Sequence, residues 1–215
     1  KEGILLKIKD KFKSIIQSVK NAVERFPVTI MVLFLYMLFL AIIIDTDWIA
    51  DEVLEYVSYF ALYLSTGAFL TESIFKNREK TSIVYYIMFC INAIVFIIVQ
   101  QIDLGEQFFD TWWKFIVCYI STLLIAGVYF LAKKSGKDFP EYMLKLVINW
   151  IKTSVVYLIL AIGVAIISSI FIYLILDGED YSLILRLELI LVGIYYFPKM
   201  LYSFVDVENE VNNFF

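Results

Sequence analysis

The sequence predicts an all-α integral membrane protein with six transmembrane helices, and three observations support this fold class. Of the 215 residues, 61% are hydrophobic and only 19% are charged, and the mean hydropathy is +0.81. A soluble domain could not cover such a composition with polar atoms. The chain has only 3 Pro and 8 Gly, too few turn residues for a many-stranded soluble β-fold. Its apolar runs extend over about 20 residues, roughly twice the length of the alternating segments of a transmembrane β-barrel.

Six apolar runs are long enough, or nearly so, to cross a hydrocarbon core of about 30 Å as helices of roughly 20 residues. The third run is short and the sixth contains charged residues. In chain order, the runs cover residues 26–44, 53–75, 82–99, 112–132, 153–176 and 181–204. We expect residues 1–25 to precede this six-span domain (26–204) as a basic amphipathic helix. Residues 205–215 are expected to form a cytoplasmic C-terminal segment.

The distribution of charge predicts the orientation of these spans. Segments 45–52, 100–111 and 177–180 contain ten acidic residues and no Lys or Arg. The segment before the first run (1–25), the loop 76–81 and the region 133–152, together with Lys199, carry sixteen of the eighteen basic residues. Basic residues concentrate in cytoplasmic loops. Both termini are therefore predicted to lie in the cytoplasm.

Residues 1–25 are predicted to lie on the membrane surface. Apolar residues from Ile4 to Phe26 fall within an arc of about 120° when they are laid out at 100° per residue. Such a stripe suits a helix in the headgroup layer of a lipid bilayer, with basic side chains reaching anionic lipid headgroups. The alternative is a helix packed on a partner protein or on the cytoplasmic loops. The basic residues flank both edges of the arc: Lys7, Lys9, Lys11, Lys13, Lys20 and Arg25.

A second interfacial helix is predicted over residues 139–152, before the fifth span, because apolar residues recur there at helical spacing. Pro140 suits the start of a helix, where its missing N–H is harmless. Glu141 and Lys145 are four residues apart in the favourable order for an ion pair. Each proline of the chain follows a phenylalanine near a predicted cytoplasmic boundary: Phe26-Pro27, Phe139-Pro140 and Phe197-Pro198.

Polar residues inside the predicted spans are the candidate site residues, because such groups are costly in hydrocarbon. Small residues spaced three or four apart before Glu72 predict a closely packed face that points this carboxylate into the bundle. The alternative for Glu72 is an ion pair with Lys76 at the cytoplasmic end. The candidates are Glu72, Asn92, Arg186 and Glu188.

Arg186 and Glu188 point about 200° apart on a helix, so they cannot simply neutralise each other. Arg186 is placed either to pair with an acidic residue of the outer loops or to reach lipid phosphate. Glu188 is placed to line a cavity or to form a structural hydrogen bond. Asn92 is placed either to bind a ligand or to bridge two helices.

The chain lacks the residues of the commonest catalytic and metal sites. It has no His, and its two cysteines, Cys90 and Cys118, lie inside apolar runs where they suit packing. We find no phosphate-binding loop and no dinucleotide fingerprint. We therefore expect no enzymatic activity, no cofactor and no nucleic-acid partner. The expected partners are the lipid bilayer with its anionic headgroups, and another membrane protein or a second copy of this chain.

Both ends of the sequence resemble a known family. The segments Glu24-Arg25-Phe26-Pro27-Val28-Thr29 and Glu208-Asn209-Glu210-Val211-Asn212-Asn213-Phe214-Phe215 are similar to the ends of the bacterial membrane family called domain of unknown function 4153. The resemblance implies a bacterial cytoplasmic membrane protein, of which this chain is the N-terminal part. It implies no catalytic residues. The polar residues within the spans suggest a transport-related or channel-like protein or a subunit of one. The short loops and the small number of these residues suggest the alternative, a non-catalytic structural or regulatory membrane partner.

Overall fold

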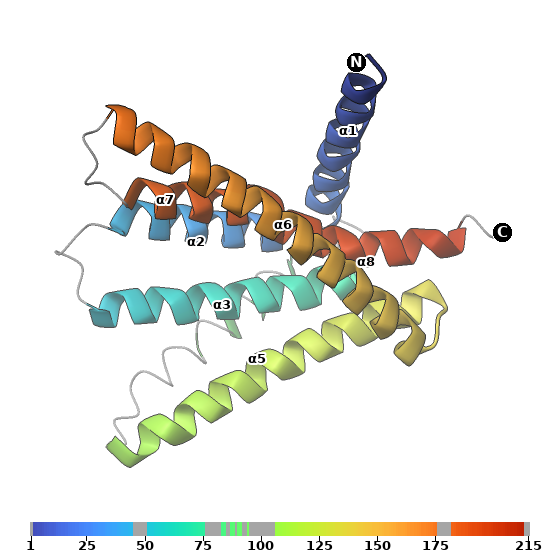
Figure 1. The fold of residues 1–215 in the computed structure, drawn as a ribbon. Helices are drawn as coiled ribbons and strands as arrows, with labels where there is room; N and C mark the ends of the chain where they lie inside the picture. The colour runs from blue at the N-terminus through green and yellow to red at the C-terminus, as the bar shows by residue number, and fades with distance from the viewer. Residues whose placement is uncertain are drawn as a thin grey trace.

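The computed structural model describes residues 2–44, 51–75, 106–175 and 182–212, with residues 83–84, 87–88, 90–91 and 94. Every regular element within these residues is a helix, which confirms the all-α prediction (Figure 1). The predicted third span, 82–99, lies mostly outside them. The elements are α1 (Glu2–Arg25), α2 (Pro27–Ile43), α3 (Asp51–Ile74), α5 (Glu106–Ser135), α6 (Phe139–Ile175), α7 (Ser182–Leu191), the π-helical segment η1 (Val192–Tyr196) and α8 (Phe197–Asn212).

The helices form a bundle from which α1 projects. Helix α3 packs against α2 and α5, while α6 packs against α7 and α8. The start of α2, the end of α3, the α5–α6 turn and the start of α8 gather at one end of the bundle, which we call the elbow end (Figure 1). Helix α1 leaves the bundle there and runs across the direction of α2 and α3, with its last turns packed on α8.

Two helical stretches of the described residues are long and apolar enough to cross a membrane, Val117–Ser135 and Phe139–Leu174. A third exists if Lys13–Arg25 and α2, which are bent by 110° relative to each other, form one span. The described helices thus establish two or three candidate spans, fewer than the six predicted. Helix α3 contains serine and threonine residues and Glu72, which lower its mean hydropathy, and α7 has only 10 residues. Neither helix is therefore both long and apolar enough to count as a candidate span.

Helix α6 corrects the predicted boundary at residue 152. The sequence predicts an interfacial helix over 139–152 and a separate span over 153–176, whereas the structure has one continuous helix of 37 residues. No Pro or Gly lies near residue 152, so nothing interrupts the backbone hydrogen bonds there. The expected ion pair is present in the first turns of α6, where Lys145 Nζ lies 3.2 Å from Glu141 Oε1.

The predicted sixth span, 181–204, is also different in the structure. Helix α7 passes into the π-helical segment η1, and α8 then continues to Asn212, well beyond residue 204. Phe197 donates its N–H to the carbonyl of Val192, five residues earlier. The next residue, Pro198, has no N–H to donate. The π turn keeps an apolar helical pattern on both sides, so the sequence alone did not reveal it.

Two glycines allow close helix packing. A Cβ atom on Gly193 of η1 would lie 3.2 Å from Met37 Cβ and 3.2 Å from Phe34 Cδ2, both on α2. A Cβ atom on Gly127 of α5 would lie 2.6 Å from Cε1 of Phe69 on α3. Real Cβ atoms do not approach other heavy atoms so closely as this second distance. A larger residue at position 127 would therefore displace the Phe69 ring or widen the α3–α5 contact.

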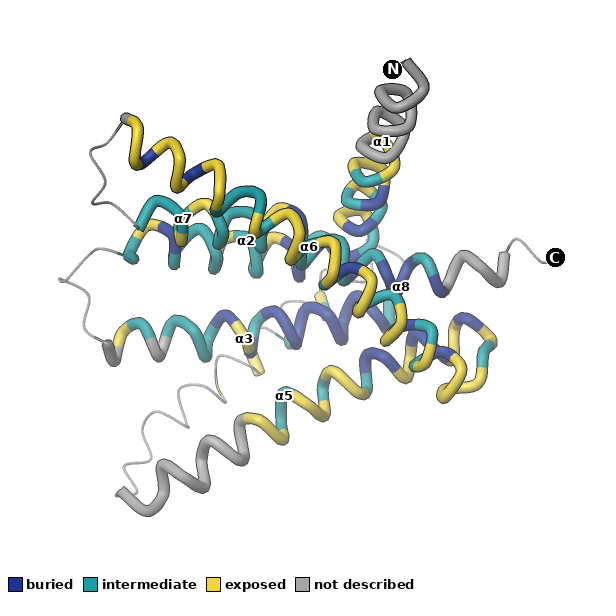
Figure 2. The backbone as a smooth tube through the Cα atoms, in the orientation of Figure 1, coloured by how far each residue is buried: buried dark blue, intermediate teal, exposed yellow. Residues whose placement is uncertain are grey.

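Burial is greatest towards the elbow end, as Figure 2 shows along α3 and the start of α8. Phe26, Leu131, Tyr142 and Leu146 are all fully buried there. Helix α6, in contrast, keeps apolar side chains exposed along its length, and Ile167 is 69% exposed. The bundle therefore has its core at one end and a long apolar surface on α6.

Candidate functional site

The chain turns sharply at Phe26, between α1 and α2. Phe26 has φ −127° and ψ 56°, outside the helical region, and Pro27 begins α2. Proline is favourable at this position, but it has no N–H of its own. The first-turn N–H groups of a helix have no partner within the helix, so those of Val28 and Thr29 need an acceptor from elsewhere. We call the segment 25–29 the elbow.

Glu72, in the last turn of α3, supplies these acceptors. Its Oε1 accepts a hydrogen bond from the N–H of Val28 at 2.8 Å. Its Oε2 accepts from Thr29 Oγ1 at 2.6 Å and from the N–H of Thr29 at 3.4 Å. The start of a helix carries partial positive charge, which favours a carboxylate at this place. Glu72 therefore caps α2 from the neighbouring helix.

The Glu72 side chain is also the most shielded charge in the part of the chain that the structure describes. The residue is 2% exposed, and the other buried polar side chains among the described residues are serines and threonines. A charge removed from water in this way must be paired or hydrogen-bonded, because leaving it without partners costs several kcal/mol. The hydrogen bonds from the elbow meet this requirement.

Two basic side chains cap the end of α3 in return. Arg25 Nη1 donates to the backbone carbonyl of Glu72 at 2.6 Å. Lys134 Nζ, from α5, donates to the carbonyls of Ser73 at 2.6 Å and Ile74 at 2.7 Å. These carbonyls have no partner within α3, and cations are favourable at a helix C-terminus. Glu72 of α3 thus caps the start of α2, and Arg25 of the elbow in turn caps the end of α3.

This position gives Arg25 a contact that the sequence did not predict. The sequence places Arg25 with the lysines that reach anionic headgroups, whereas the structure turns its guanidinium towards the end of α3. The guanidinium carbon also lies 5.2 Å from the centre of the Phe26 ring, within cation–π range. Arg25 therefore belongs to the elbow.

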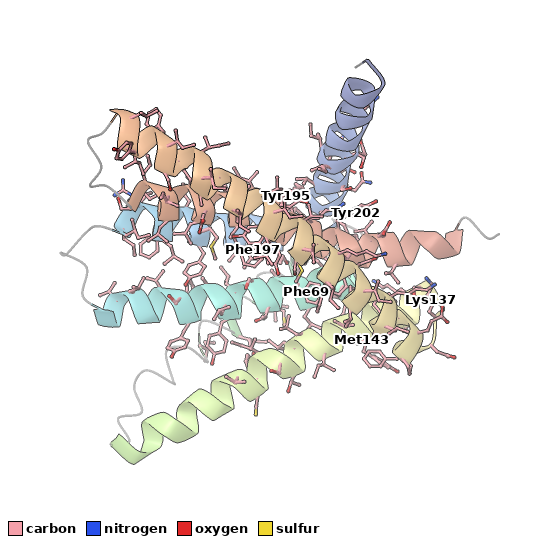
Figure 3. All side chains as sticks on the ribbon, viewed as in Figure 1. Phe69, Lys137, Met143, Tyr195, Phe197 and Tyr202 are labelled. Atoms are coloured by element: carbon pink, nitrogen blue, oxygen red, sulfur yellow. The ribbon has the colours of Figure 1, made fainter. Side chains whose placement is uncertain are left out.

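Aromatic rings cover the capped elbow. The ring centres of Phe26 and Phe69 are 5.6 Å apart, and that of Phe204 lies 5.1 Å from Phe69 and 6.1 Å from Phe26. Trp150 of α6 packs edge-on against Phe204 at 5.7 Å. Figure 3 shows Phe69 between α3 and the neighbouring helices. Excluding water in this way strengthens the polar contacts and raises the cost of breaking them.

Further polar contacts attach α8 at the elbow end. Lys199 Nζ donates to Ser18 Oγ of α1 at 3.0 Å. Lys137 Nζ, in the α5–α6 turn, donates to the carbonyl of Val207 at 3.1 Å, and Figure 3 shows this lysine beside α8. Helix α8 is therefore joined to α1 and to the α5–α6 turn by lysine side chains.

The structure does not bring Arg186 or Glu188 to Glu72. Arg186 and Glu188 are partly buried on α7, which starts at the end of the bundle opposite the elbow (Figure 1). Glu188 interacts electrostatically with Tyr157 of α6. Asn92 and Lys76 lie outside the described residues. The predicted face of small residues before Glu72 is buried at Ala61, Ser65 and Ala68.

The candidate basic residues of α1 divide into two groups. Lys13 and Lys20 are exposed, and Lys20 Nζ lies 3.9 Å from Glu24 Oε1. Lys7, Lys9 and Lys11 lie on the helix, but their side chains are outside the described part of the structure. Only Lys13 and Lys20 can therefore be assigned a surface position.

Sequence reasoning missed two members of the site, Thr29 and Lys134. Thr29 stands two residues after Pro27, where a hydroxyl in the first turn of a helix is the local signal. Lys134 follows the predicted fourth run (112–132), whereas in the structure it lies in the last turn of α5 and reaches α3. No pattern within the sequence indicates which carbonyl groups such a lysine contacts.

This arrangement suits a structural cap better than acid–base chemistry, because both carboxylate oxygens of Glu72 already accept hydrogen bonds. No group of three or more His, Cys, Asp or Glu is placed to hold a metal ion within the described residues. Cys90 and Cys118 are free and exposed. The hydrogen bonds of the site join the start of α2 to the end of α3.

In the described part of the chain, the fold and the capped elbow define an all-helical protein with two or three candidate membrane-crossing helices. The chain matches no protein-family profile, no curated protein and no solved structure. The resemblance to domain of unknown function 4153 therefore stays a prediction.

Proposed function

We propose that this chain is a multi-pass protein of the bacterial cytoplasmic membrane that acts as a non-catalytic structural or regulatory partner of other membrane proteins. The proposal rests on the hydrogen bonds that Glu72 forms. Intramembrane charges usually mark a substrate or ion pathway. Here the buried carboxylate instead caps α2 and lies beneath aromatic rings, where it stabilises the bundle.

The proposed topology has six crossings with both ends in the cytoplasm. The elbow end holds Arg25, Lys134, Lys137 and Lys199, so the basic residues that determine orientation lie together in space. Helices α2 and α6 run away from this end, and α3, α5 and α7 run towards it, as crossings in both directions would (Figure 1). Both facts support a cytoplasmic elbow end.

Cysteine accessibility tests this topology. Single cysteines are introduced at Asp47 and at Arg78 in a C90S/C118S background, and a membrane-impermeant maleimide is applied to intact cells. We expect the cysteine at position 47 to react from outside and that at position 78 to react only after the membrane is opened. Labelling of both from the same side would contradict six crossings.

Reconstitution into liposomes tests the role. A structural partner leaves the permeability to protons, potassium and small anions at the level of protein-free liposomes. Increased permeability that disappears with Arg186→Gln or Glu188→Gln would overturn the proposal. A stability measurement on the same variants separates loss of flux from loss of folding.

A transport-related or channel-like role is the second candidate, and the π-helical segment η1 favours it. π turns are frequent at functional sites, and interrupted membrane helices often adjoin transporter binding sites. The segment η1 follows directly after the helix that carries Arg186 and Glu188. The liposome experiment distinguishes this role from the structural one.

A further inference from the structure

Helix α1 contacts the bundle along only part of its apolar surface. Ser18, Ala22 and Phe26 are buried on one face, where α1 packs against α8 and the core. The neighbouring face carries a strip of apolar side chains that the bundle does not cover. Ile16 is 59% exposed and Val23 is 40% exposed in this strip.

Lys13 and Lys20, whose side chains are exposed, lie along the far edge of this strip. At 100° per residue, Lys20 and Lys13 follow Ile16 by about 40° and 60° around the helix. Gln17 and Glu24, both exposed, come next. The order around α1 is therefore the bundle face, the apolar strip, the lysines, and then the acidic and amide side chains.

The bend at the elbow sets the direction of α1. The axes of α1 and α2 differ by 110°. If α2 crosses a membrane, α1 must lie nearly in the plane of that membrane, at the elbow end (Figure 1). A helix in this position has the bilayer on one side and the cytoplasm on the other.

We infer that the strip of Ile16 and Val23 docks on the cytoplasmic surface of an anionic lipid bilayer, with Lys13 and Lys20 on the lipid phosphates. This inference rests on the proposed membrane topology. The charge of the lysine row complements anionic headgroups, and their long stems can follow the apolar surface to the phosphate level. Glu24 and Gln17 remain on the water side.

Hydrogen bonds to the bundle fix the orientation of α1 before it contacts the membrane. Lys199 is hydrogen-bonded to Ser18, and Arg25 is hydrogen-bonded to the end of α3. A surface held in its bound orientation loses less conformational freedom on docking. We therefore expect α1 to occupy one depth in the membrane surface.

Spin-label accessibility in lipid nanodiscs tests this inference on the full chain. Single cysteines for labelling replace Ile16, Val23, Gln17 or Glu24 in a C90S/C118S background. We expect labels at positions 16 and 23 to show a several-fold higher ratio of oxygen to nickel-chelate collisions than labels at positions 17 and 24. Equal ratios at all four positions would overturn the inference.

A label at Ile166 of α6, an exposed residue in a candidate span, is the control for the membrane topology. If position 166 is shielded from the chelate and position 16 is not, the docking inference fails and the topology stands. If position 166 is open to the chelate, the proposed topology itself fails.

A separate measurement tests the preference of α1 for anionic lipids. Replacing phosphatidylcholine by phosphatidylglycerol is expected to deepen the label at position 16. Lys13→Gln combined with Lys20→Gln is expected to abolish this shift. A shift that persists in the double variant, or the absence of any shift in the wild-type background, would overturn the role of the lysines.

Discussion

Thr29 Oγ1 donates a hydrogen bond of 2.6 Å to Oε2 of Glu72, which lies 43 residues later in the chain. This contact joins the first turn of α2 to the last turn of α3. Arg25, from the same elbow, contacts the backbone of Glu72. The elbow therefore depends on a carboxylate that no local feature of residues 25–29 supplies.

Glu72→Ala is expected to lower the free energy of unfolding by about 2–4 kcal/mol, because it leaves buried donors of Val28 and Thr29 without their acceptor. Glu72→Gln should lie between this variant and the wild type, since the amide oxygen keeps one acceptor. Unfolding of the purified chain in mild detergent measures both. Glu141→Ala is the control, because the Glu141 side chain is 56% exposed. A Glu72→Ala protein as stable as this control would refute the cap.

Thr29→Val removes the hydroxyl donor while keeping the shape of the side chain. Hydrogen bonds to charged groups contribute about 1.5–3 kcal/mol, so we expect a loss in that range. Thr29→Ser keeps the hydroxyl and should recover most of the stability. The same unfolding measurement compares the two, and equal losses for valine and serine would show that packing, and not the hydrogen bond, is what matters.

Gly127→Ala is expected to destabilise the bundle by about 1–3 kcal/mol, the usual cost of overpacking. The added methyl group would lie 2.6 Å from Phe69 Cε1, so the buried Phe69 ring must shift or α3 and α5 must separate. Gly163→Ala in α6 is the matched control, since a Cβ at that position meets nothing within 4 Å. Alanine is the better helix former, so the control should be neutral or stabilising by up to about 1 kcal/mol. Equal effects at both positions would contradict the close packing.

A double-mutant cycle can measure the bond between α2 and α3, where Tyr36 Oη donates to Ser58 Oγ at 2.9 Å. Tyr36→Phe and Ser58→Ala each remove one partner. We expect a coupling free energy of about 0.6 kcal/mol, typical of hydrogen bonds between membrane helices. The four unfolding free energies of the cycle provide it. Strict additivity would show that this hydrogen bond makes no net contribution.

Local pattern accounts for much of the helical structure. Apolar runs predicted helices where α2, α3 and α5 lie, and the Phe-Pro pairs mark the starts of α2, α6 and α8. Pro27 ends one helix and begins another because of its own ring geometry. Such features depend on neighbouring residues, so a sequence shows them directly.

The structure has a continuous helix at residue 152 and a π turn within the sixth run, and a physical reason explains why the sequence predicted neither. An amphipathic stretch such as 139–152 has the same pattern whether it ends in a loop or continues as one helix. The π turn at Val192–Tyr196 packs against α2, where a Cβ atom on Gly193 would lie 3.2 Å from Phe34 and from Met37. The periodicity of apolar residues does not indicate whether a helix continues past residue 152 or where a π turn forms.

By itself, the sequence determined that the chain is helical and apolar, and it singled out Glu72 as a costly charge. The tertiary structure decided what that charge does. The partners of Glu72 are N–H groups freed by a helix start 44 residues earlier, and Lys134 caps the same helix end from about 61 residues later. Contacts across such separations depend on how whole helices pack, and the order of residues within one helix does not record them.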